Sequence, residues 1–167
     1  MKAFIDSQFN YCSLVWMYHN RSVNNRINRI HERALRIAYK DALSSFEELL
    51  VKDKSVTIHE RNLQKVVIEI YKVKNGLSPE FMKEIFRLSS NPYNLRNKKE
   101  LKNSNIKTVY CGSETLSHRG PEIWSSVPDD IKNARSLTEF KAKIKKWKPE
   151  SCTCRLCKTY IPQLGFI

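Results

Sequence analysis

The sequence predicts a mainly α-helical protein, in which a helical bundle is followed by a smaller, mixed and partly irregular C-terminal segment with a cysteine-rich tail. Apolar residues recur at steps of three and four in the long segments 21–40 and 57–75, which is the spacing of one helix face. Three Ser/Thr-x-x-Glu sequences, beginning at residues 45, 57 and 136, match the capping box that opens a helix. Residues 106–110 have the β-branched character of a strand.

The first predicted element is a helix over residues 3–18, with Phe4, Leu14, Val15 and Trp16 among its apolar residues. Cys12 falls within this segment, and we interpret it as a small core residue. A break at residues 20–22 separates this helix from the next one, whose N-cap Ser22 can supply.

The segment 21–40 carries two interlocked stripes on one predicted helix. One set is apolar and is expected to be the buried face of the helix; it consists of Val23, Ile27, Ile30, Ala34 and Ile37. The second stripe is cationic, and it consists of Arg26, Arg29, Arg33, Arg36 and Lys40. Glu32 is the only acid between Arg21 and Lys40, so the helix hardly neutralises itself. We interpret the cations as contacts for a phosphate backbone; a solvated basic face, an anionic membrane and an acidic partner are the alternatives.

Two more capping boxes divide the next stretch of the N-terminal half. The first, at residues 45–48, predicts a short helix that runs through Val51. The second, at residues 57–60, opens a longer helix that ends at Asn75-Gly76, where glycine suits a left-handed terminal residue. Its expected core face is Leu63, Val66, Val67, Ile70 and Val73. Ser78-Pro79-Glu80 then predicts another short helix, with proline at the first helical position.

The composition changes at Ser89, where a segment rich in Asn, Lys and Arg predicts a surface loop or linker over residues 89–108. Gly120-Pro121 is expected to precede or open a short helix that carries Ile123 and Trp124. The capping box at residues 136–139 opens a last helix, which Pro149 stops. Its inward residues are expected to be Leu137, Phe140, Ile144 and Trp147, and its outward residues Lys141, Lys143, Lys145, Lys146 and Lys148. The predicted domains are therefore a helical unit at 1–88, a segment with linker, possible hairpin and basic helix at 89–150, and a cysteine-rich tail at 151–167.

The charge of the chain favours anionic partners. There are 30 Lys and Arg residues against 17 Asp and Glu, which gives a formal net charge of +13. Such a field promotes salt-sensitive association with polyanions. No stretch approaches the ~20 apolar residues that span a membrane, and the N-terminal residues do not form a secretory signal. We therefore expect a nuclear or cytoplasmic protein that is not secreted and has no membrane partner, with reduced or metal-bound cysteines.

A cluster of three thiols lies near the C-terminus, at Cys152, Cys154 and Cys157. Closely spaced thiolates beside cations can bind zinc, so zinc is the one cofactor that the sequence suggests. A structural zinc site needs four ligands, and the fourth is unknown; Cys111, His118 or a second chain would have to supply it. An unliganded cysteine cluster is the alternative interpretation.

The sequence contains no catalytic constellation. Asp129-Asp130 follows Pro128, where acids suit the free N–H groups of a helix start better than a two-metal site. The four histidines are scattered, and we expect them to be surface or packing residues. The four glycines form no phosphate-binding loop, and no Ser, His and Asp set is evident.

An ordered series of strings resembles the region that follows the polymerase core in non-LTR, LINE-type or jockey-like retrotransposon reverse transcriptases. The resemblance extends over essentially the whole chain, and its strings are MKAFIDSQFNYCSLVW (1–16), NRINRIHERALR (25–36), SFEELL (45–50), IYKVKNG (70–76), YNLR (93–96), GPEIW (120–124) with Val127-Pro128 and Ile131-Lys132, Phe140-Lys141, and the Cys152 to Cys157 cluster. The cluster departs from the Cys-Cys-His-Cys knuckle of some relatives, which weakens the case for zinc-dependent RNA binding.

The resemblance implies a thumb-like helical region and a C-terminal segment that hold template RNA and target DNA. The Phe/Tyr-x-Asp-Asp motif, which holds the family's catalytic aspartates, does not occur here. We therefore expect the isolated chain to be a fragment of an RNA-directed DNA polymerase and not an enzyme. Its expected partners are RNA or DNA, together with the missing polymerase core. Phosphate contacts are expected from Arg26, Arg29, Arg33, Arg36 and Lys40, and from Lys141, Lys145 and Lys148. A protein-interaction module or a non-functional, pseudogene-like fragment is the alternative.

Overall fold

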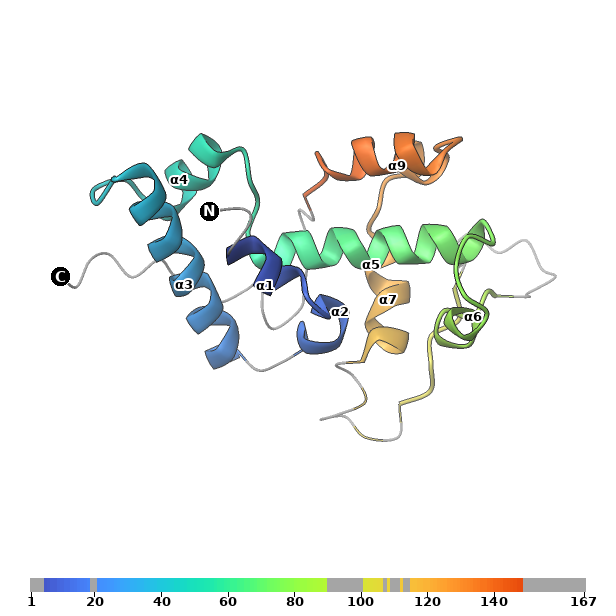
Figure 1. Cartoon of the computed structure of the whole chain (residues 1–167). Helices are drawn as coiled ribbons and strands as arrows, with labels where there is room; N and C mark the ends of the chain where they lie inside the picture. The colour runs from blue at the N-terminus through green and yellow to red at the C-terminus, as the bar shows by residue number, and fades with distance from the viewer. Residues whose placement is uncertain are drawn as a thin grey trace. The chain divides into compact units, whose positions relative to one another are not determined.

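The computed structural model describes residues 5–18, 21–89, 101–106, 108, 112 and 115–148. The helices in these ranges are α1 (Ser7–Asn10), α2 (Ser13–Trp16), α3 (Arg21–Tyr39), α4 (Phe46–Asp53), α5 (Ile58–Lys74), α6 (Phe81–Ile85), α7 (Leu116–Ser125), α8 (Asp129–Lys132) and α9 (Leu137–Ile144) (Figure 1). No strand occurs in the described part, which has one isolated antiparallel bridge between Leu88 and Leu101. The mainly α prediction is therefore confirmed. The cysteine-rich tail and most of the 106–110 segment lie outside the described residues.

The chain divides into two compact units within α5, after Asn62. The first unit contains α1 to α4 and the first turn of α5, and the second contains the rest of α5 and α6 to α9. The boundaries that composition suggested at residues 88 and 150 stay predictions.

The single helix predicted over residues 3–18 is wrong, because the chain breaks into α1 and α2. Tyr11 is extended and Cys12 is left-handed, with φ 44°, which interrupts the regular i to i−4 hydrogen bonding. The Trp16 indole N–H donates to the Tyr11 carbonyl at 2.6 Å and ties the new helix to the break. Cys12 is exposed, so its assignment to the core is also wrong.

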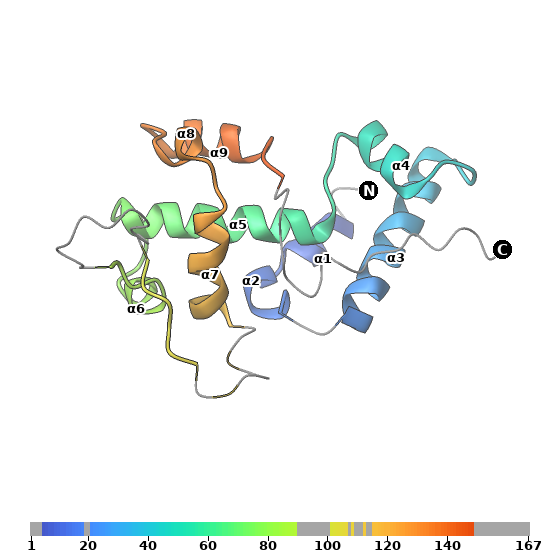
Figure 2. The same cartoon turned by 180° about the vertical axis from the view of Figure 1, so that it is seen from behind.

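In the first unit, α3 packs against α4, and both views in Figures 1 and 2 show them side by side. Both hydrogen bonds of the capping box predicted at residues 45–48 are present, so that prediction is confirmed. The Glu48 backbone N–H donates to Ser45 Oγ at 3.2 Å, and the Ser45 N–H donates to Glu48 Oε2 at 2.8 Å. The cap fixes the start of α4, whose Phe46, Leu49 and Leu50 then form one buried cluster with Leu35 of α3.

The predicted buried face of α3 is wrong except at Ala34, which is buried as expected. Val23, Ile30 and Ile37 are 36%, 56% and 70% exposed, and Ile27 is only half-buried. The buried residues of this helix are Asn24, Asn28, His31, Ala34 and Leu35. The core therefore lies about 100° round the helix from the predicted face, which is the rotation between successive residues. Contacts with the first unit's aromatic rings explain the shift, because His31 packs edge-on against Phe46 with 5.6 Å between ring centroids.

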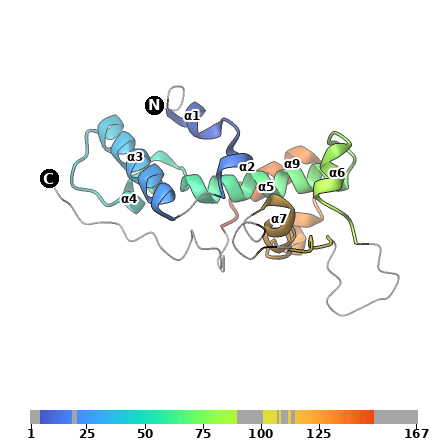
Figure 3. The same ribbon diagram turned by 90° about the horizontal axis from the view of Figure 1, so that it is seen from below.

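In the second unit, the expected core face of α5 is confirmed. Its members Leu63, Val66, Val67, Ile70 and Val73 are all buried. α9 lies on one side of this part of α5, and α7 lies on the other (Figures 1 and 3). Tyr71 stacks on Phe140 with 4.0 Å between centroids, and its hydroxyl donates to the Ala134 carbonyl at 2.8 Å. Gly76 ends the helix with φ 70°, as predicted.

Two proline-containing helix starts differ from prediction. α6 begins at Phe81 and not at Pro79. α7 begins at Leu116, so Pro121 lies inside it rather than at its start. The neighbouring Gly120 is required by packing, because a Cβ there would collide with the Phe86 ring. This close approach draws α7 against the segment that follows α6.

The two remaining capping boxes are present in different degrees. At residues 57–60 both reciprocal hydrogen bonds form, between Thr57 and Glu60. At α9 the Glu139 N–H donates to Ser136 Oγ at 3.2 Å, while the Glu139 carboxylate accepts from the Arg135 N–H at 3.0 Å. The first hydrogen bond of the capping box is therefore present at α9, whereas the second comes from the N–H of Arg135 and not from that of Ser136. No helix in the described ranges is long and apolar enough to cross a membrane.

Candidate nucleic-acid interface

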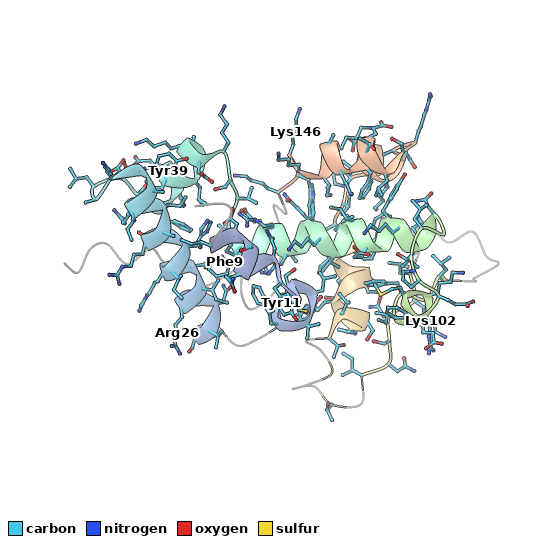
Figure 4. All side chains as sticks on the ribbon, viewed as in Figure 1. Phe9, Tyr11, Arg26, Tyr39, Lys102 and Lys146 are labelled. Carbon is cyan, nitrogen blue, oxygen red and sulfur yellow. The ribbon has the colours of Figure 1, made fainter. Side chains whose placement is uncertain are left out.

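Three arginines form an exposed line on α3, which we name the cationic row: Arg26, Arg29 and Arg33. The steps between them correspond to about 4.5 and 6 Å along the helix axis. Arg26 lies near the N-terminal end of α3, and its side chain extends away from the ribbon (Figure 4). Long guanidinium side chains at this spacing can reach neighbouring phosphates of one strand, whose charges repeat every ~3.4 Å along a duplex axis.

The other two predicted cations of this helix have different surroundings. Arg36 is partly buried, with Nη2 at 2.8 Å from Glu32 Oε1 and Nη1 donating to the Ala42 carbonyl. Its guanidinium therefore secures the turn that follows α3. Lys40 is exposed one residue beyond the end of α3, in a left-handed conformation with φ 51°. The structure thus keeps three of the five predicted cations together on the helix surface.

α3 carries a single acid beside the cationic row. Glu32 is the only acid on α3, and it is engaged by Arg36. Within the described ranges, Arg26 and Arg33 form no ion pair. Beyond the helix, the Asp41 carboxylate is paired with Lys52 at 3.1 Å. Hydrogen bonds from Ser44, and then Lys52, hold the pKa of Asp41 well below its usual range, so this acid stays ionised within its own cluster.

The predicted second basic surface lies in the other unit. Lys141 is exposed on α9, and Lys145 and Lys148 are exposed beyond its last residue. Lys146 is also exposed there, with its side chain extending from the ribbon (Figure 4). Lys143 differs from them, because it pairs with Glu139 at 2.8 Å and donates to the Asp130 carbonyl. The Lys143 hydrogen bond is also the main cause of the lowered pKa of Glu139.

The predicted zinc ligands Cys152, Cys154 and Cys157 lie outside the described residues, and so does Cys111. His118, the other suggested fourth ligand, has Nε2 at 3.6 Å from Glu122 Oε1. In the described part of the chain, no three His, Cys, Asp or Glu side chains are arranged to hold a metal ion. The helix-start interpretation of Asp129-Asp130 is confirmed, because α8 begins at Asp129.

Sequence reasoning missed the two features that adjoin the cationic row. The first is the exposure of Val23, Ile30 and Ile37, which the helical period places on one face but assigns to the core. The second is the buried His31, whose ring nitrogens have no hydrogen-bond partner within the described chain. Burial lowers the pKa of this histidine, with a further contribution from the nearby Arg61 charge. Asn24, Asn28, His31 and Leu35 do recur at steps of four, three and four, but polar residues on that spacing give no apolar signal.

Comparison with known proteins gives no further assignment: no protein-family model matches the chain, and neither does any curated protein or solved structure. The structure shows a mainly helical protein of two compact units, with exposed arginines on α3.

Proposed function

We propose that this chain is a non-catalytic nucleic-acid-binding protein that holds the sugar-phosphate backbone of RNA or DNA through the cationic row of α3. The observation that carries the proposal is the exposure of Arg26, Arg29 and Arg33 on a helix whose single acid is already paired. The lysines at 141, 145 and 148 supply a second basic surface. The resemblance to the thumb and post-polymerase region of non-LTR reverse transcriptases supports the same function, and we propose a nuclear or cytoplasmic location.

Phosphate contacts explain why the binding is expected to depend steeply on salt. Each phosphate that a cation neutralises releases counterions, so affinity falls with a slope of about 0.9 per contact on duplex DNA and about 0.7 on a single strand. Such contacts position the partner but read no bases. Binding is therefore expected to be weakly specific for sequence.

The test measures binding isotherms for single-stranded RNA and for a duplex at two salt concentrations. The variant Arg26→Gln/Arg29→Gln/Arg33→Gln removes the cationic row. On duplex DNA three lost contacts flatten the logarithmic salt slope by about 2.7, equivalent to about a 40-fold smaller loss of affinity between ~50 and ~200 mM salt. On single-stranded RNA the corresponding change in slope is about 2.1.

The control variant is Lys54→Gln/Lys83→Gln/Lys102→Gln, which removes the same net charge from exposed positions off α3. General electrostatic attraction predicts equal slopes for the two triple variants, whereas the proposal predicts a larger change for the α3 variant. A flat salt response of the wild type, or no binding at low salt, would contradict the proposal. Primer extension with Mg²⁺ tests the non-catalytic part, for which we expect no product.

A further inference from the structure

α3 exposes a row of aliphatic residues at its surface. We name Val23, Ile30 and Ile37 the apolar stripe; these residues are 36%, 56% and 70% exposed and repeat every seven residues. Half-buried Ile27 and buried Ala34 line its inner edge. Together the five positions have the alternating four and three spacing of a coiled-coil seam. From Val23 to Ile37 the stripe is about 21 Å long.

The apolar stripe is unusual because the same helix buries polar side chains in the first unit. The buried face of the same helix includes Asn28 and His31, whose Oδ1 and ring nitrogens have no hydrogen-bond partner within the described chain. The helix thus turns polar side chains inward and its strongest apolar periodicity outward. An amphipathic helix with an exposed, regularly spaced aliphatic row is typical of helix-to-helix recognition.

We propose that the apolar stripe binds an acidic amphipathic helix of a partner protein. Charge on the border of the stripe determines the occupant. Arg26 and Arg33 each directly precede a residue of the inner edge, Ile27 and Ala34, and both are exposed. In a helix pair these positions flank the seam and select a partner by its charges. A partner helix with carboxylates beside its own apolar seam would neutralise Arg26 and Arg33.

A second copy of this chain is a poor occupant, because a symmetric pairing sets cationic borders beside each other. The net charge of +13 adds to that repulsion. A membrane surface also fits the stripe less well, because its exposed members are short aliphatic residues without the aromatic residues typical of interfacial helices.

The experiment uses the full chain and a labelled synthetic peptide of about three heptads, with Leu or Ile at the seam and Glu at both flanking positions. Mutual repulsion of the glutamates keeps this peptide from pairing with itself at neutral pH. Two comparison peptides have Lys in place of Glu, or the acidic composition in scrambled order. Fluorescence anisotropy at ~0.1 M salt is expected to show binding of the ordered acidic peptide at least tenfold tighter than that of either comparison peptide.

Three variants assign the binding to the stripe. Ile30→Ser/Ile37→Ser is expected to weaken peptide binding at least tenfold, whereas Leu43→Ser/Val51→Ser, which alters exposed aliphatic residues elsewhere in the first unit, leaves it within about twofold. The charge reversal Arg26→Glu/Arg33→Glu is expected to exchange the preference, so that the lysine peptide binds more tightly than the glutamate peptide. Circular dichroism of each variant checks that the helices persist.

The same variants separate this proposal from nucleic-acid binding, since Ile30→Ser/Ile37→Ser keeps all arginines and is expected to leave RNA affinity unchanged. The proposal is overturned if the ordered acidic peptide binds no more tightly than the scrambled one, or if charge reversal leaves the preference intact. Dimers that the Ile30→Ser/Ile37→Ser change dissociates, seen by sedimentation, would overturn it in favour of a second copy. Stripe-dependent binding to anionic phospholipid vesicles without peptide binding would overturn it in favour of a membrane.

Discussion

The orientation of α3 can be tested with two aliphatic residues that lie two positions apart. Leu35 is fully buried among Phe46, Leu49 and Leu50, whereas Ile37 is 70% exposed. Leu35→Ala removes buried methyl groups and leaves a cavity, which costs about 2–5 kcal/mol of the free energy of unfolding. Ile37→Ala removes groups that are mostly in water and gains helix propensity, so we expect a change within about 0.5 kcal/mol.

The assay is urea unfolding followed by circular dichroism, with the midpoint and the slope fitted for the wild type and both variants. The two substitutions are matched in chemistry and in helix, so their difference reports the buried face directly. The apolar period of the sequence alone predicts the opposite order, with Ile37 in the core. A loss above about 2 kcal/mol for Ile37→Ala together with a smaller loss for Leu35→Ala would refute the orientation and, with it, the exposed apolar stripe.

Three further predictions concern residues within the single units: a buried histidine, a glycine that touches an aromatic ring, and a helix cap. Burial lowers the pKa of His31 below 6.5, so the unfolded chain binds this proton more readily than the folded one, and the free energy of unfolding falls as the pH drops below about 6.5. Urea unfolding at pH 7.5 and pH 5 should show a smaller decrease in the free energy of unfolding at pH 5 for His31→Leu than for the wild type. Gly120→Ala places a methyl group against the Phe86 ring, so we expect a loss of about 1–3 kcal/mol in thermal or urea unfolding, and a loss below about 0.5 kcal/mol would contradict the close approach. Ser45→Ala removes the α4 cap and should cost about 0.5–2 kcal/mol, whereas an unchanged midpoint would show that the capping box is unimportant.

Local signals in the sequence predicted much of the fold. The helix starts with side-chain caps at Ser45, Thr57 and Ser136 were predictable, because each depends on hydrogen bonds between residues three apart. The core face of α5 was predictable for a similar reason, since its apolar period coincides with the face that the neighbouring helices cover.

Features that depend on distant contacts were not predictable. The buried face of α3 is determined by the position of α4 and by the packing of Phe46 on His31, and neither is encoded in the period of α3 itself. The break at Cys12 places a residue other than glycine in the left-handed conformation, and the sequence gives no indication of a turn there. Gly120-Pro121 predicts a helix that starts at or after these residues, but α7 begins earlier, at Leu116.

The candidate site was predictable in composition and only partly in geometry. Spacing alone located Arg26, Arg29 and Arg33 on one exposed side of the helix. The same spacing could not reveal that Arg36 is used by Glu32 and the Ala42 carbonyl, because that contact requires the chain to turn back after α3. The thiol cluster lies outside the described residues, so zinc binding stays a prediction.

The most direct test of nucleic-acid binding by α3 is the salt dependence of duplex binding, measured for the wild type and for Arg26→Gln/Arg29→Gln/Arg33→Gln over ~50 to ~200 mM salt. The phosphate-contact account predicts a steep slope for the wild type that the triple variant flattens by about 2.7. Equal slopes for the two proteins would contradict it, because the cationic row would then make no contact with phosphate.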